Sequence, residues 1–132
     1  MQAKTKTLNG IKELKNLEKI SISYCRNLHN IDALSSCPKL KTVLIKKCVK
    51  LLNINLASNS LERLTLDRAA DLKFLANTPN LSALYFTDLK DGDMEPILQR
   101  FRSPWQVDFY PYERPYYQYS KKQLHALLEA KI

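Results

Sequence analysis

Glycine is scarce in this chain, and its scarcity excludes several classes of nucleotide-binding protein. Only Gly10 and Gly92 occur among the 132 residues. The P-loop and the dinucleotide-binding motif each need several glycines close together, because the backbone must approach a phosphate closely. Neither motif occurs in the sequence.

Long apolar runs and catalytic histidine motifs are also lacking. No stretch approaches the roughly 18 uninterrupted apolar residues of a membrane span, and the lysine-bearing first residues have no apolar segment of a secretory signal behind them. The two histidines, His29 and His125, stand in no catalytic motif, and no nucleophile–base pair or pair of catalytic carboxylates is visible. We therefore expect no enzyme activity, no cofactor and no membrane contact.

The chain has three cysteines, Cys25, Cys37 and Cys48, and none has a histidine at metal-ligand spacing. Small secreted domains more often carry an even and denser set. We therefore expect reduced thiols, no metal site and a cytoplasmic protein. The acidic segment 88–95 does not fit a calcium loop either, because Leu89 would stand at a ligand position.

A repeated apolar pattern is what the sequence does contain. Its four copies begin at Leu17, Leu40, Leu61 and Leu81, which are 23, 21 and 20 residues apart. The first copy consists of Leu17, Ile20, Ile22, Cys25 and Leu28. All five positions are apolar in the first three copies if Cys and Ala are counted, and the first four are apolar in the fourth copy. The inner alternation predicts a short strand with one buried face, followed by a turn and a second apolar group that closes the coil.

This pattern resembles the leucine-rich repeat family over residues 8–101. The resemblance implies an α/β fold, a solenoid with a curved parallel β-sheet and with short helices or turns on its convex side. The family usually places Asn or Cys at the turn, where Cys25 and Cys48 stand in the first two copies. Ala69 and Leu89 replace them in the last two. We therefore expect an irregular strand ladder in the second half.

We predict one domain over residues 1–132, and it has three parts. These are an N-terminal half-repeat or cap over 1–16, four repeats over 17–101, and an aromatic-rich C-terminal cap over 102–132. Solenoids need such caps, because an end coil would otherwise expose its apolar core.

The C-terminal cap is predicted to contain a strand, an aromatic loop and a helix. Alternation from Trp105 to Phe109 predicts a fifth strand. A capping box of Ser120 and Gln123 predicts the start of the helix. Its apolar face would hold Leu124, Leu127, Leu128 and Ile132. Asp93 is expected to be the N-cap of an earlier helix within the fourth repeat.

The resemblance implies that the residues between the buried strand positions face the concave surface, where we expect a protein partner to bind. The predicted contacts are Lys19, Ser21, Tyr24, Leu44, Lys46, Lys47, Arg63, Arg68, Tyr85 and Asp88. A secondary contact loop would use Trp105, Tyr110, Tyr112, Tyr116 and Tyr117. Tyrosine is favoured at interfaces, but the same residues also suit a structural cap, which we favour.

The net charge of +8 is concentrated at one end of the chain. Residues 1–60 hold 11 basic and 3 acidic residues. This imbalance favours a protein partner with an acidic or mixed surface, such as a toxin or enzyme that the chain would neutralise as an inhibitor or immunity protein. Adaptor or assembly roles and nucleic-acid binding by the basic half are alternatives. Nucleic acid is less favoured, because most aromatic residues lie at the opposite end of the chain.

Overall fold

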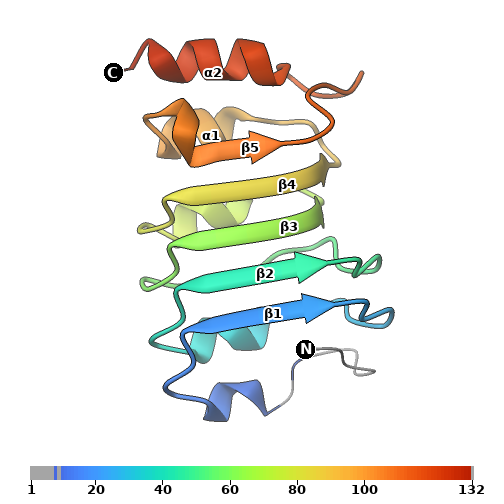
Figure 1. Ribbon diagram of the computed structural model, residues 1–132, viewed down its shortest axis with the longest axis vertical. Helices are drawn as coiled ribbons and strands as arrows, with labels where there is room; N and C mark the ends of the chain where they lie inside the picture. The colour runs from blue at the N-terminus through green and yellow to red at the C-terminus, as the bar shows by residue number, and fades with distance from the viewer. Residues whose placement is uncertain (1–7, 9, 132) are drawn as a thin grey trace.

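The five strands of the computed structural model are parallel and follow one another across the sheet in chain order (Figure 1). They are β1 (Lys19–Ser23), β2 (Thr42–Lys46), β3 (Arg63–Ala69), β4 (Ala83–Leu89) and β5 (Val107–Phe109). The structure describes residue 8 and residues 10–131. The strand register pairs equivalent repeat positions, since Ile20, Val43, Leu64 and Leu84 align across the first four strands. The predicted α/β arrangement with a parallel sheet is thereby confirmed.

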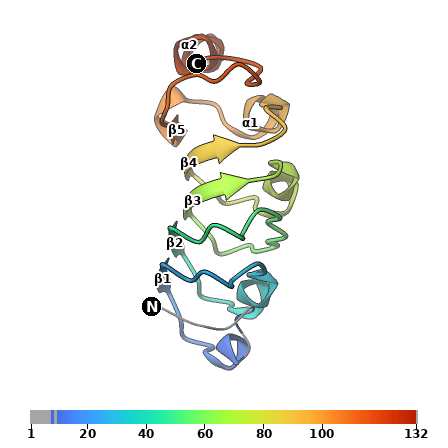
Figure 2. The ribbon, with the colours of Figure 1, turned by 90° about the vertical axis from the view of Figure 1, so that its right-hand side faces the viewer.

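Short helices lie in the connections between the strands, except between β2 and β3, and at both ends of the described part of the chain. They are the 3-10 helices η1 (Ile11–Glu13), η2 (Asp32–Ser36), η3 (Lys73–Asn77) and η4 (Pro104–Gln106), and the α-helices α1 (Glu95–Arg100) and α2 (Lys121–Glu129). The return segments of the repeats and α1 lie on one side of the sheet, and α2 lies beyond β5 at the end of the stack (Figures 1 and 2). None of the described helices is long and apolar enough to cross a lipid bilayer.

The core lies between the sheet and these return segments, and the apolar repeat positions form it. Cys25, Cys48, Ala69 and Leu89, at the four turn positions, are all buried. In the second half, β3 and β4 have seven residues each and pair as far as Ala69 and Leu89, although the register omits the pair of Asp67 and Thr87. Burial of an apolar side chain thus suffices to hold the turn where no cysteine is present.

The predicted N-terminal half-repeat falls partly outside the described residues, since residues 1–7 and 9 are among those not described. Leu8 and Ile11 lie within the described part, and both side chains are buried against the core. Their burial beside η2 follows the apolar pattern of the repeats.

The segment around Trp105 differs from the prediction. The strand begins at Val107, and Trp105 lies in η4 with its side chain 90% exposed. The cause is local, because Pro104 occupies the first helical turn and a capping box joins Ser103 with Gln106. Such a capping box starts a helical turn and delays the strand.

The two C-terminal helices confirm part of the prediction. The capping box at the start of α2 is present, and Leu124 and Leu128 are fully buried. Leu127 is 40% exposed and therefore lies off the buried face, whereas Ile132 lies outside the described residues. The N-cap of α1 is Met94 rather than Asp93, although an Asp93 carboxylate oxygen accepts a hydrogen bond from the Glu95 amide at 3.0 Å.

Candidate functional site

The face of the sheet that lies away from the return segments is called the open sheet face here. Side chains of β1 to β4 alternate between the core and this face, as the period of a strand requires. The register places Ser21, Leu44, Thr65, Tyr85 and Asp108 in one row across all five strands. Residues far apart in the sequence thus form one continuous surface.

Six of the ten predicted contact residues lie within this alternation on the open sheet face. They are Lys19, Ser21, Leu44, Lys46, Arg63 and Tyr85. The other four each lie one residue before the turn position of their repeat, at or near the carboxyl ends of the strands. They are Tyr24, Lys47, Arg68 and Asp88. The predicted set therefore comprises a face and an edge.

A shallow hollow on the open sheet face brings together residues of the predicted concave face and one residue of the predicted secondary contact loop. It has a volume of about 300 Å³, and its lining includes Leu44, Arg63 and Tyr85 from the predicted face together with Trp105. Trp105 had been assigned to a secondary loop, but η4 places it beside the face. Sequence pattern did not reveal this proximity, because Trp105 stands outside the repeat.

A second hollow of about 250 Å³ lies toward the carboxyl edge of the same face. Tyr24, Lys46, Lys47, Asp67 and Tyr85 are among its lining residues. Since Tyr85 lines both hollows, they are parts of one surface. Aromatic rings and cations of this kind contribute much of the binding energy at protein interfaces.

Asp88 is not an open contact residue, and the prediction for it is wrong. The residue is only 8% exposed. Its carboxylate lies 3.3 Å from both Lys90 Nζ and Arg114 Nε and accepts a hydrogen bond from the Tyr116 hydroxyl. Burial raises the pKa of Asp88, but the hydrogen bonds from Tyr116 and Lys90 and the charge of Arg114 outweigh it, so the pKa is lowered overall. Asp88 therefore anchors the C-terminal loop.

The predicted tyrosine loop divides into packed and exposed members. Tyr117 is buried against the rings of Phe86 and Phe109, and its hydroxyl accepts a hydrogen bond from the Leu89 amide at 3.1 Å. Tyr110 and Tyr112 are exposed and pack edge to face at 5.2 Å between ring centroids. Tyr117 is thus a structural residue, while Tyr110 and Tyr112 remain accessible.

Tyr24 and Lys47 have an unusual backbone conformation at equivalent positions of the first two repeats. Each has a φ of 58°, which lies in the left-handed region. A residue other than glycine held there costs about 1–3 kcal/mol. The equivalent positions of the next two repeats, Arg68 and Asp88, are instead paired within β3 and β4.

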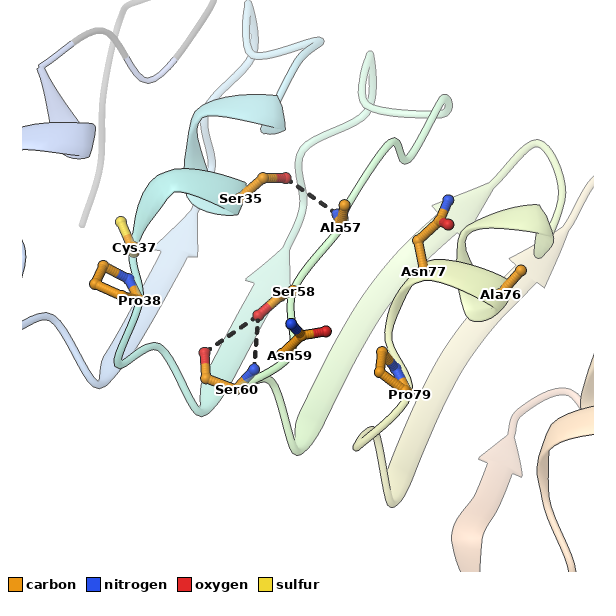
Figure 3. A pocket seen from close by; sticks show the side chains of 10 residues that line it. All are labelled: Ser35, Cys37, Pro38, Ala57, Ser58, Asn59, Ser60, Ala76, Asn77 and Pro79. Atoms are coloured by element: carbon orange, nitrogen blue, oxygen red, sulfur yellow. Dashed lines mark hydrogen bonds between the residues drawn. The ribbon is translucent and has the colours of Figure 1, made fainter.

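The opposite side of the molecule carries a hollow of about 570 Å³, which Figure 3 shows. It opens where the second repeat has neither a helix nor a strand over residues 53–60, between η2 and η3. Its lining has no charged residue, and the Ser35 hydroxyl accepts a hydrogen bond from the Ala57 amide at 3.1 Å across it. Ser58 and Ser60 are joined through their hydroxyl groups at 3.2 Å. This hollow offers no charge for a partner to recognise.

The described residues contain no group of three or more His, Cys, Asp or Glu side chains that could hold a metal ion. The cysteines at 25, 37 and 48 are buried and form no disulfide bond. The site is therefore a surface of cations, aromatic rings and hydroxyl groups.

Comparison with known protein families gives a match over most of the sequence. The family described as the endo-beta-N-acetylglucosaminidase EndoS LRR domain matches residues 2–93. Neither the curated proteins nor the solved structures yield a match. The family is named after a repeat domain of an enzyme, and domains of this kind are in general binding modules. Because the match covers well over half of the sequence and coincides with the repeats, the chain belongs to the leucine-rich repeat family.

Proposed function

We propose that this chain is a non-catalytic module that binds a protein partner through the open sheet face. The observation that supports this most directly is the hollow where Leu44, Tyr85 and the exposed Trp105 meet. Trp105 is exposed, and Leu44 and Tyr85 are partly exposed; together they provide apolar area that a merely hydrated surface does not need. Lys46 and Arg63 lie on the same face, so a partner with an acidic or mixed surface fits it best.

We further propose that binding neutralises the partner, as an inhibitor or immunity protein neutralises a toxin or enzyme. The proposed architecture is a single solenoid domain over residues 1–132 with a curved sheet. Residues 1–16 and 102–132 would act as its caps, the latter supported by the burial of Leu124 and Leu128 beyond β5. Three cysteines that form no disulfide bond suit a reducing compartment such as the cytoplasm.

The test is affinity capture from native lysate, followed by affinity measurement with the purified partner. The face variant Lys46→Glu/Arg63→Glu is compared with a control, Lys73→Glu/Lys122→Glu, which has the same change in net charge. Both control lysines are exposed and lie on η3 and α2. The proposal expects a stoichiometric protein that resists nuclease, binds the control normally and is lost with the face variant. Equal binding of both variants would place the interface elsewhere.

Nucleic-acid binding is the second candidate, and the 11 basic residues among residues 1–60 favour it. Phosphate contacts weaken steeply between about 50 and 200 mM salt, because binding releases counterions. Recovery of nucleic acid alone, lost over that salt range, would replace the protein-binding proposal with this one.

A further inference from the structure

The loops that follow β1 and β2 protrude side by side at the carboxyl edge of the sheet (Figure 1). A cleft of about 700 Å³ lies between them. It is lined by Tyr24, Arg26, Asn27, Lys47, Val49 and Lys50. This cleft is called the loop cleft below.

The backbone of the loop cleft is held in a conformation that glycine would adopt more readily. Tyr24 and Lys47 are its two left-handed residues, and their large side chains make the conformation costly. Strain of this kind is concentrated at functional sites, where the side chain serves a purpose other than folding. Tyr24 is 64% exposed, so packing within the chain does not account for its ring.

The lining combines positive charge with apolar area. Arg26, Lys47 and Lys50 supply three cations, and the lining includes no acidic residue. Val49, which is 55% exposed, lies in the same lining as Tyr24. An Arg68 guanidinium nitrogen donates to the Val49 carbonyl oxygen at 3.3 Å, which ties this loop to β3. The loop cleft thus has an apolar part, formed by Tyr24 and Val49, with cationic side chains around it.

The loop cleft is also continuous with the open sheet face. Tyr24 and Lys47 line both the cleft and the 250 Å³ hollow, which reaches Tyr85. A partner seated on the face could therefore extend a segment into the cleft without leaving the surface.

We infer that the loop cleft binds a short acidic peptide segment of the protein partner, with an apolar side chain between Tyr24 and Val49 and carboxylates beside the cations. This inference rests on the proposed function. A peptide fits better than nucleic acid, because the exposed Val49 side chain can pack against an apolar side chain but cannot form a hydrogen bond or ion pair with a phosphate. Carboxylates beside Arg26, Lys47 and Lys50 would form charge-assisted hydrogen bonds.

The first test uses a fluorescent peptide, Glu-Glu-Asp-Phe-Glu-Asp-Glu, and a control in which Ser replaces Phe. Fluorescence anisotropy should show the Phe peptide binding about tenfold more tightly, because the ring gains apolar burial. Tyr24→Gly should reduce that affinity about tenfold, because the Phe ring loses its apolar contact with the tyrosine ring. Its thermal midpoint should be unchanged or higher, because glycine adopts a positive φ without steric cost.

Several results would overturn the inference. They are equal binding of the two peptides, unchanged binding by Tyr24→Gly, or tighter binding of a thymidine decanucleotide than of the Phe peptide. Tyr24→Asn is a second variant, because asparagine also tolerates the left-handed region. If the ring had only a structural role, both variants would lower the thermal midpoint and the affinity would follow the loss of fold.

The purified partner separates failure of this inference from failure of the proposed function. A partner that binds Tyr24→Gly/Lys47→Gly normally but is lost with Lys46→Glu/Arg63→Glu would overturn the loop cleft and leave the open sheet face standing. A partner that binds both variants normally would overturn both. Loss with each double variant, while Lys73→Glu/Lys122→Glu binds normally, supports both.

Discussion

Replacing Asp88 by asparagine tests whether one carboxylate anchors the C-terminal loop to β4. The change keeps the shape of the side chain and removes its charge. Hydrogen bonds to a charged group contribute about 1.5–3 kcal/mol each. The half-exposed Lys90 contributes little, and the asparagine oxygen can still accept one hydrogen bond. We therefore expect the free energy of unfolding to fall by about 2 kcal/mol, mainly through the weakened contacts with Arg114 and Tyr116.

Urea unfolding followed by far-ultraviolet circular dichroism measures this loss. With a slope of about 1–3 kcal/mol per molar urea for a small protein, the midpoint should fall by about 1 M. Glu113→Gln is the matched control, because it removes one negative charge from an exposed position in the same loop. Its midpoint should remain close to that of the wild type.

The pH dependence gives a second measure. The folded pKa of Asp88 lies below its ordinary value of 3.8. Its ionised form therefore stabilises the protein above the unfolded pKa, and this contribution is lost as the pH falls through the folded pKa. The stability gap between wild type and Asp88→Asn should be constant from about pH 5 to pH 8 and shrink below about pH 3.8. A gap under about 0.5 kcal/mol at neutral pH would refute the anchoring role.

Three further perturbations test the packing. Phe109→Ala should lower the free energy of unfolding by about 3–5 kcal/mol, because its buried ring stacks on another phenylalanine with centroids 4.9 Å apart; a urea midpoint near that of wild type would contradict this. Gly92→Ala should cost more than about 1 kcal/mol, because its φ is +66° and a Cβ would lie 1.8 Å from the Tyr116 carbonyl oxygen; an unchanged thermal midpoint would contradict the close approach. All three cysteines are buried, and burial raises the pKa of Cys37 and Cys48. Because a reagent cannot reach a buried thiol, it should label no cysteine in the native state and all three in denaturant; rapid native labelling would show that the thiols are accessible.

Sequence predicted the repeated part of the fold well, because each strand depends on a local pattern that recurs. The register across the sheet pairs the same repeat position in every strand, so identifying one copy effectively identifies the others. The second return segment is an instructive exception. Ile54 and Leu56 are buried with exposed Asn55 between them, and this alternation favours extended backbone over the helical turns of η2 and η3.

The candidate site was harder to predict, because part of it depends on contacts between residues far apart in the sequence, which no local sequence pattern indicates. Asp88 occupies the same repeat position as Tyr24, but Tyr24 is exposed and Asp88 is buried. The difference comes from two residues that lie 26 and 28 positions after Asp88. These are Arg114 and Tyr116, which engage the carboxylate. Trp105 joins the open sheet face only because a capped 3-10 turn delays β5.

Two acidic side chains of the sheet are paired within the chain, and this affects how the surface would attract the proposed partner. Asp67 accepts a hydrogen bond from the Cys48 amide at 3.2 Å, and Asp88 is neutralised by Lys90 and Arg114. The acids of β3 and β4 are thus engaged by the chain itself, whereas Lys47 stays exposed at the loop cleft. Long-range attraction of an acidic partner acts mainly on the association rate and is screened by salt. Added salt should therefore slow the association of the purified partner in stopped-flow mixing and leave its dissociation rate nearly unchanged. If salt instead changed mainly the dissociation rate, buried charge pairs rather than long-range attraction would determine the salt dependence.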